Sequence, residues 1–104
     1  MALKIFWTQL AEEKLYDIFE YHKEVAGIKI ARILVEGIEN QTLQLLKNPE
    51  IGVIEDLLIN RPQQFRYLIY KNYKIIYWVD LAKSAIFIAT VFDTRQNPVK
   101  IQNL

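Results

Sequence analysis

QFRYLIY at residues 64–70 opens the part of the sequence that decides the fold, and YKIIYWV at 73–79 and AIFIATVF at 85–92 follow it. All three runs are rich in β-branched and aromatic residues and are separated by short polar gaps, a pattern that predicts an antiparallel meander. The gap between the first two runs is Lys71-Asn72. A two-residue gap with Asn, which tolerates a positive φ, predicts a β-hairpin.

A tight hairpin fixes which side chains face one another across the first two strands. Both faces of the meander are largely apolar, so something must cover at least one of them. Arg66 stands out because it lies inside an otherwise apolar strand. Counting back from the turn predicts the pairs Tyr70–Tyr73, Leu68–Ile75, Arg66–Tyr77 and Gln64–Val79.

The residues before the meander predict a short strand and two helices. Residues 3–7 alternate as a strand does, and Thr8 then suits the N-cap of a helix over about residues 9–24. Ala26-Gly27 marks a break, after which a second amphipathic helix of about twenty residues runs to Asn48-Pro49. The short loop predicts a helical hairpin whose apolar stripe covers one face of the meander.

The sequence therefore predicts an α+β fold in the order β-α-α-β-β-β, with the helical hairpin packed on one face of an antiparallel sheet. Residues 1–104 form a single domain in this interpretation. Residues 49–62 form an irregular apolar connection that packs on the domain. The third meander strand stops near Phe92, and residues 99–104 form a short, mobile tail.

Composition excludes several classes of protein. The chain has no cysteine, which excludes disulfide frameworks and thiolate metal sites. The N-terminus lacks the pattern of a signal peptide, and no run approaches the roughly 18 apolar residues of a membrane span, so a cytoplasmic protein is expected. The formal net charge of +1 hides an asymmetry, because residues 1–56 carry a net −4 and residues 57–104 a net +5. The predicted sheet thus lies in the basic half.

The order of predicted elements, together with specific residues, resembles the RelE/ParE superfamily of bacterial toxins. The resemblance covers nearly the whole chain and implies the superfamily rather than one activity within it. Its carriers are Trp7-Thr8, Ala11, Leu15, Tyr21, Ala31, Leu45 through Pro49 to Gly52, Arg66, residues 73–77 (YKIIY) and residues 91–98 (VFDTRQNP).

This resemblance implies the toxin of a type II toxin–antitoxin module, held inert by a cognate antitoxin protein. ParE-like members poison DNA gyrase, whereas RelE-like members cleave messenger RNA in the ribosomal A site, and fold alone does not choose between them. A third interpretation is an inactive binding module that acts as a corepressor with its antitoxin. None of the three calls for a metal or another cofactor.

RNA cleavage of the RelE type needs a group to stabilise the charged phosphorane and an acid and base for proton transfer. Arg66 and Arg95 are the candidates for the first role, since two guanidiniums bind a phosphate strongly. The acid and base are harder to find, because no tyrosine follows Tyr77 and the single histidine, His22, lies in the first helix. The lack of an evident acid and base favours gyrase poisoning, which needs a binding surface rather than proton transfer. The remaining proton-transfer candidates are Glu55, Asp56, Asp93 and Lys100.

Each arginine also has a purely structural interpretation. Arg66 can pair with Glu55 or Asp56 and stack on Tyr77, and Arg95 can pair with Asp93 or with the C-terminus of a helix. For a toxin that works by binding, we expect the target to contact residues around the sheet exit. These are Arg61, Tyr77, Asp93, Gln96 and Lys100.

The antitoxin partner is expected to bind an exposed apolar surface. One helical hairpin covers one sheet face only, so the second face should form a patch that favours association. The basic half suits an acidic, partly disordered segment that folds on binding. We expect a strand or helix of the antitoxin to lie along the sheet or in the groove beside the hairpin.

Overall fold

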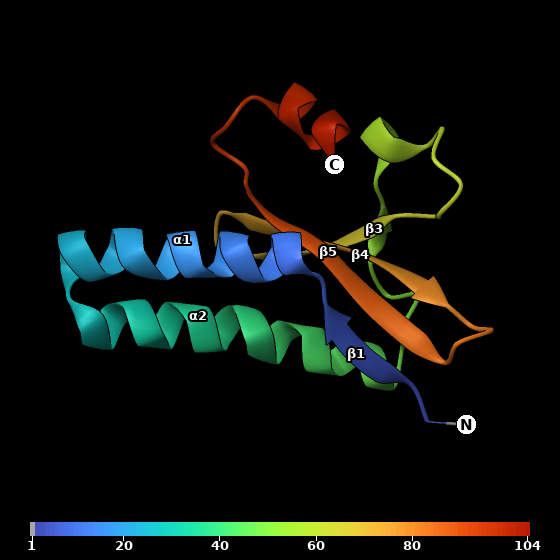
Figure 1. The fold of residues 1–104 in the computed structure, drawn as a ribbon, viewed down its shortest axis with the longest axis horizontal. Coiled ribbons are helices and arrows are strands. Elements are labelled where there is room, and N and C mark those ends of the chain that lie inside the picture. The colour runs from blue at the N-terminus through green and yellow to red at the C-terminus, as the bar shows by residue number, and fades with distance from the viewer. Residues whose placement is uncertain (1) are drawn as a thin grey trace.

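Residues 2–104 are described by a computed structural model. Two antiparallel helices lie against a five-stranded sheet, and the C-terminal segment returns beside it (Figure 1). This arrangement confirms the predicted α+β fold. The elements are β1 (Lys4–Trp7), α1 (Gln9–Ala26), α2 (Ile28–Thr42), the 3₁₀ segment η1 (Leu43–Leu46), β2 (Val53–Ile54), the 3₁₀ segment η2 (Asp56–Leu58), β3 (Arg66–Tyr70), β4 (Tyr73–Asp80), β5 (Ala85–Asp93) and the 3₁₀ segment η3 (Pro98–Asn103).

The hairpin of β3 and β4 has the predicted register. Arg66 lies opposite Tyr77, and Tyr70 lies opposite Tyr73. The expected Gln64–Val79 pair is wrong, because β3 begins only at Arg66 and its pairing with β4 starts at Arg66–Tyr77. The left-handed turn residue is Lys71, with φ 53°, rather than Asn72. The asparagine instead uses its side chain to bind the end of β5.

The sheet is mixed rather than wholly antiparallel, which corrects the predicted topology. The strand order is β1-β5-β4-β3-β2, and β1 runs parallel to β5 with Lys4 beside Ala85 and Trp7 beside Ile88. Thr8 fixes this junction, since its hydroxyl donates to the Ile88 carbonyl oxygen at 2.9 Å. The sequence of a four-residue edge strand does not indicate whether the strand pairs in the parallel or the antiparallel direction. The sequence likewise does not locate the two-residue strand β2 within the irregular connection.

The helices follow the predicted signals. The Thr8 hydroxyl accepts a hydrogen bond from the Ala11 N–H, as an N-cap does, and Gly27 ends α1 with φ 96°. α2 stops at Thr42 and continues as η1, so its last turn tightens before the expected end. Gly37 allows α2 to approach β3, because a methyl group there would collide with the Tyr70 ring. In residues 2–104, no helix combines the length and the apolar character needed to cross a membrane.

The main core lies between the helices and the sheet. α1 packs on β5 and on α2, and α2 also reaches β3. The stripe of apolar residues on each helix supplies one side of this core, and alternate residues of β3, β4 and β5 supply the other. Its buried members are Ala11, Leu34, Ile38, Leu45, Leu68, Tyr73, Ile75, Tyr77, Ile86, Ile88 and Val91.

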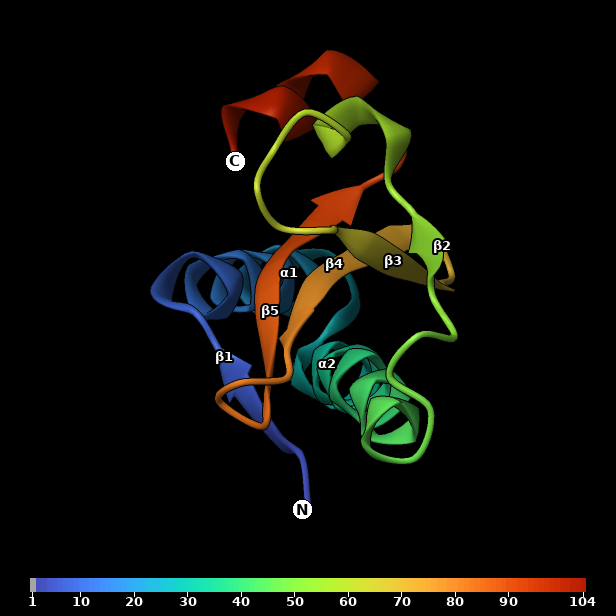
Figure 2. The same cartoon turned by 90° about the vertical axis from the view of Figure 1, so that its right-hand side faces the viewer.

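A second core lies on the opposite face of the sheet, and the chain covers it with its own segments. η2 and η3 lie next to each other above this face (Figure 2). The expected mobile tail is therefore wrong, because Ile101 is buried in the second core and orders the segment around it. The second face of the sheet, which was expected to be exposed, is also partly covered. The buried members of this core are Leu58, Phe65, Ile76, Ala89 and Ile101.

Candidate functional site

Asp93 and Arg95 form an ion pair where the chain leaves β5. The distance from Arg95 Nη2 to Asp93 Oδ2 is 2.8 Å, and Arg95 Nε lies 3.1 Å from Asp93 Oδ1. The backbone N–H of Arg95 donates to the same carboxylate. These hydrogen bonds lower the pKa of Asp93 to about 2. Arg95 therefore forms the structural ion pair with Asp93 that was considered from the sequence, although its side chain stays mostly exposed.

The turn between β3 and β4 braces this exit. The Asn72 side-chain amide donates to Asp93 Oδ1 at 3.2 Å, and the Asn72 carbonyl accepts from both the N–H and the hydroxyl of Thr94. Tyr73 lies opposite Asp93 across the strands, and its hydroxyl is 3.0 Å from His22 Nε2. Burial, and then the nearby aspartate, raise the pKa of Tyr73. The exit is therefore a fixed surface rather than a loose end.

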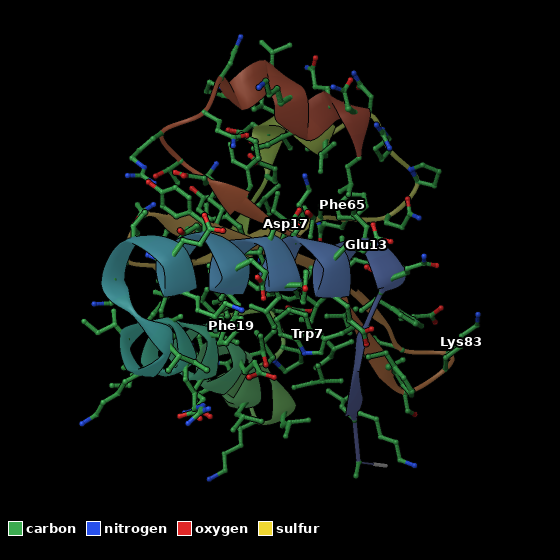
Figure 3. The ribbon with its side chains drawn as sticks, turned by 60° about the vertical axis from the view of Figure 1, so that its left-hand side comes forward. Trp7, Glu13, Asp17, Phe19, Phe65 and Lys83 are labelled. Atoms are coloured by element: carbon green, nitrogen blue, oxygen red, sulfur yellow. The ribbon has the colours of Figure 1, made fainter. Side chains whose placement is uncertain are left out.

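A cavity of about 410 Å³ lies between this exit and α1. Sequence interpretation missed its helical side, because the charged residues of α1 look like an ordinary solvated face. Lys14, Asp17 and Tyr21 line the cavity, and their spacing of three and four residues puts them on one side of the helix. Figure 3 shows Asp17 on the side of α1 away from Trp7 and Phe19. The spacing of these three residues is the feature of the sequence that could have indicated the helical side of the cavity.

Arg66 and Tyr77 have a different role, since both hold the loop before β2. Arg66 Nη1 donates to the Gly52 carbonyl at 2.9 Å and to the Glu50 carbonyl at 3.2 Å. The Tyr77 hydroxyl donates to the Pro49 carbonyl at 2.7 Å and accepts from the Gly52 N–H at 2.9 Å. Burial raises the pKa of this tyrosine. Tyr77 is fully buried, so the expectation that it contacts a target does not fit this structure.

The expected pairing of Arg66 with Glu55 is wrong, because Lys74 occupies that carboxylate. Lys74 Nζ lies 2.9 Å from Glu55 Oε1, and the same ammonium lies 4.1 Å from the Tyr67 ring centroid. Glu55 is only 4% exposed, so this is a buried acid with a single cationic partner. No acidic residue lies within five positions of Lys74 in the sequence. Its partner lies 19 residues away in the irregular connection, which spacing does not reveal.

The two arginines with candidate catalytic roles do not meet. Arg66 aligns with Tyr77, at the far end of the hairpin from the turn, whereas Asp93 aligns with Tyr73 at the turn. Four residues of strand separate these levels, roughly 13 Å at the rise of a β-strand. Two strand spacings of about 4.8 Å each add to that separation. Each guanidinium has its own partners in this arrangement, backbone carbonyls for Arg66 and Asp93 for Arg95.

The remaining predicted target residues divide around η3. Gln96 and Lys100 line a second cavity of about 290 Å³ beside α1. Arg61 lies on the other side of η3, where its guanidinium donates to the carbonyls of Gln102 and Leu104 at 2.6 Å each. Arg61 thus holds the C-terminal segment. Within residues 2–104, no group of three or more histidine and acidic side chains is arranged to hold a metal ion.

Comparison with known proteins identifies the class first through the fold. A solved structure described as the chromosomal ParDE TA system from P. aeruginosa matches with a TM-score of 0.73 and 19% identity, over 88% of this chain and 96% of the other. A free-state mutant of the E. coli toxin RelE matches with a TM-score of 0.62 and 15% identity, over 98% of this chain and 94% of the other. The fold is therefore that of the RelE/ParE toxins.

The family follows from the sequence itself. A family model described as the ParE toxin of the type II toxin-antitoxin system parDE matches residues 5–98. This chain belongs to that family. No significant match was found among curated proteins. The predicted superfamily is confirmed, and membership implies a cognate antitoxin as partner.

Proposed function

We propose that this toxin acts in the cytoplasm by poisoning DNA gyrase and that its cognate antitoxin neutralises it by binding. The family membership supports this activity over the RelE-like one. One geometric observation carries the choice. Arg66 and Arg95 belong to opposite ends of the β3–β4 hairpin and are already bound, the first to backbone carbonyls and the second to Asp93.

Two of the groups considered for proton transfer are already engaged in the structure. His22 is bonded to the hydroxyl of Tyr73, and Glu55 is buried against Lys74. Ribonucleolytic catalysis requires an acid, a base and a phosphate-binding group around one ribose. A toxin that works by binding needs only a rigid surface, and the braced exit from β5 supplies one.

The test compares the two targets directly with purified chain. Supercoiling of relaxed plasmid by gyrase should fall as toxin is added, and messenger RNA on translating ribosomes should stay intact. In bacteria, thymidine incorporation should fall before leucine incorporation within minutes of induction. Ribosome-dependent cleavage with normal supercoiling would refute the proposal. Loss of that cleavage in an Arg66→Ala/Arg95→Ala variant would then assign it to the arginines.

The RelE-like activity remains a second candidate because the fold also matches RelE over nearly the full chain. The third candidate is an inactive corepressor. It predicts no growth arrest when soluble chain accumulates without antitoxin, whereas both active toxins predict arrest.

The surface that best suits the antitoxin is a groove beside the helical hairpin. It measures about 620 Å³ and runs between β1 and the two helices. Figure 3 shows Trp7 and Phe19 on this side of α1. Glu12 and Glu39 also line the groove, so the matching helix has an apolar face with basic residues at its margins. The antitoxin segment proposed here is thus basic where it meets the hairpin, rather than acidic throughout.

A further inference from the structure

A continuous groove separates α1 from the C-terminal segment. Two cavities, of about 410 Å³ and about 290 Å³, are both lined by Lys14, Phe92 and Gln96, so they adjoin. On the helix side the lining runs from Leu10 to Tyr21, about 16 Å at the rise of an α-helix. That length matches about five residues of extended peptide. We call this the α1–exit groove.

One half of the groove favours an anion. Lys14 and Lys100 line the smaller cavity, and no acidic side chain does. Within residues 2–104, neither lysine forms an ion pair with an acidic residue. Leu10, Phe92 and Ile101 give the same half an apolar lining. Two unpaired ammonium groups beside apolar surface are complementary to an acidic side chain next to an apolar one.

The other half is formally neutral, because Asp17 and Asp93 offset Lys14 and Arg95 in the lining of the larger cavity, and it is therefore less favourable to a continuous polyanion. Asp17 and Asp93 line the larger cavity together with Arg95. The guanidinium is already engaged by Asp93, which leaves the Asp17 carboxylate without a cation bound to it in the described chain. A nucleic acid strand that placed one phosphate between the lysines would bring the next phosphates toward these carboxylates. Peptide backbone carries no such charge, and the Gln96 amide can both donate to it and accept from it.

We propose that the α1–exit groove binds an extended acidic-amphipathic peptide segment of a partner protein. One aspartate or glutamate of the peptide lies between Lys14 and Lys100, and a neighbouring apolar side chain contacts Phe92 and Ile101. The proposal deepens the proposed function, on which it rests for the identity of the partner, because the partner implied is the protein target of the toxin.

The test selects peptides with the full chain as bait. A phage library of random nonapeptides is panned on immobilised toxin, and the enriched peptides are titrated into ¹⁵N-labelled toxin. We expect enriched sequences to carry Asp or Glu beside apolar residues and to shift backbone signals of residues 10–21 and 90–103. The Lys14→Glu/Lys100→Glu variant should bind them about tenfold or more weakly.

The matched control is Lys29→Glu/Lys83→Glu, which makes the same change in net charge at two exposed lysines outside the groove. It should bind with unchanged affinity. Absence of enrichment, enrichment of basic sequences, shifts on another face, or equal weakening by both variants would each overturn the proposal. The supercoiling assay uses no peptide, so failure of the gyrase proposal and failure of the groove are separate results.

Discussion

Removing the hydroxyl group of Tyr77 should destabilise the fold strongly without removing any surface that a target can reach. In Tyr77→Phe, the buried Gly52 N–H loses its acceptor and the Pro49 carbonyl loses its donor. An unsatisfied buried polar group costs about 1–3 kcal/mol. The Pro49 carbonyl is only partly buried and keeps some access to water. We therefore expect a loss of about 2–3 kcal/mol in the free energy of unfolding, roughly 10–20 °C in Tm for a domain of this size.

The assay is urea unfolding followed by circular dichroism, with midpoint and slope measured for both proteins. Tyr16→Phe is the control, because Tyr16 is exposed on α1 and its hydroxyl forms no hydrogen bond with any of residues 2–104. It should change stability by less than about 0.5 kcal/mol. A Tyr77→Phe protein as stable as wild type would refute the hydrogen-bonding role. At a temperature where the variant is fully folded, its toxicity per folded molecule should equal that of wild type.

Three further predictions concern packing and charge. Gly37→Ala forces a methyl group into the Tyr70 ring and should lower the stability by about 2 kcal/mol in urea unfolding, and the same substitution should cost clearly less in a Tyr70→Ala background, where the ring is absent. The pKa of Asp93 is lowered in the folded state, so its contribution is complete above the ordinary pKa near 3.8 and is lost as pH falls toward 2. Asp93→Asn should flatten the acid limb of a stability–pH curve in that window, and an unchanged limb would contradict the pairing. Lys74→Met leaves a buried carboxylate unpaired and should cost about 2 kcal/mol, while adding Glu55→Leu should restore most of it; a double variant less stable than the single one would count against the pair.

Local patterns predicted much of the fold. Thr8 and Gly27 set the limits of α1 through capping and backbone conformation, and the two-residue turn fixed the register of β3 and β4. Each of these depends on residues close together in the sequence. The parallel pairing of β1 with β5 joins positions about 80 residues apart, and no periodicity within either strand specifies it.

The candidate site was predictable only in part for the same reason. The Asp93–Arg95 pair spans two residues and could be anticipated, whereas Lys74 and Glu55 meet across a folded connection. Whether Tyr77 is buried depends on whether its face of the sheet is covered. The alternation of residues along the strand does not indicate which face is covered. The groove beside α1 could not be predicted, because it depends on the position of η3, and the turn-forming residues before η3 do not indicate that position.

The place of β5 in the sheet has a consequence for biosynthesis. β5 is the last strand to leave the ribosome, yet it lies between β1, one of the first segments made, and β4. Until it emerges, the N-terminal strand has no partner and α1 can pack on α2 but not on the sheet. A nascent chain that stalls before this point therefore lacks the strand that joins β1 to the rest of the sheet, and the complete sheet cannot form. The order of synthesis itself delays the appearance of a folded toxin until its last strand has left the ribosome.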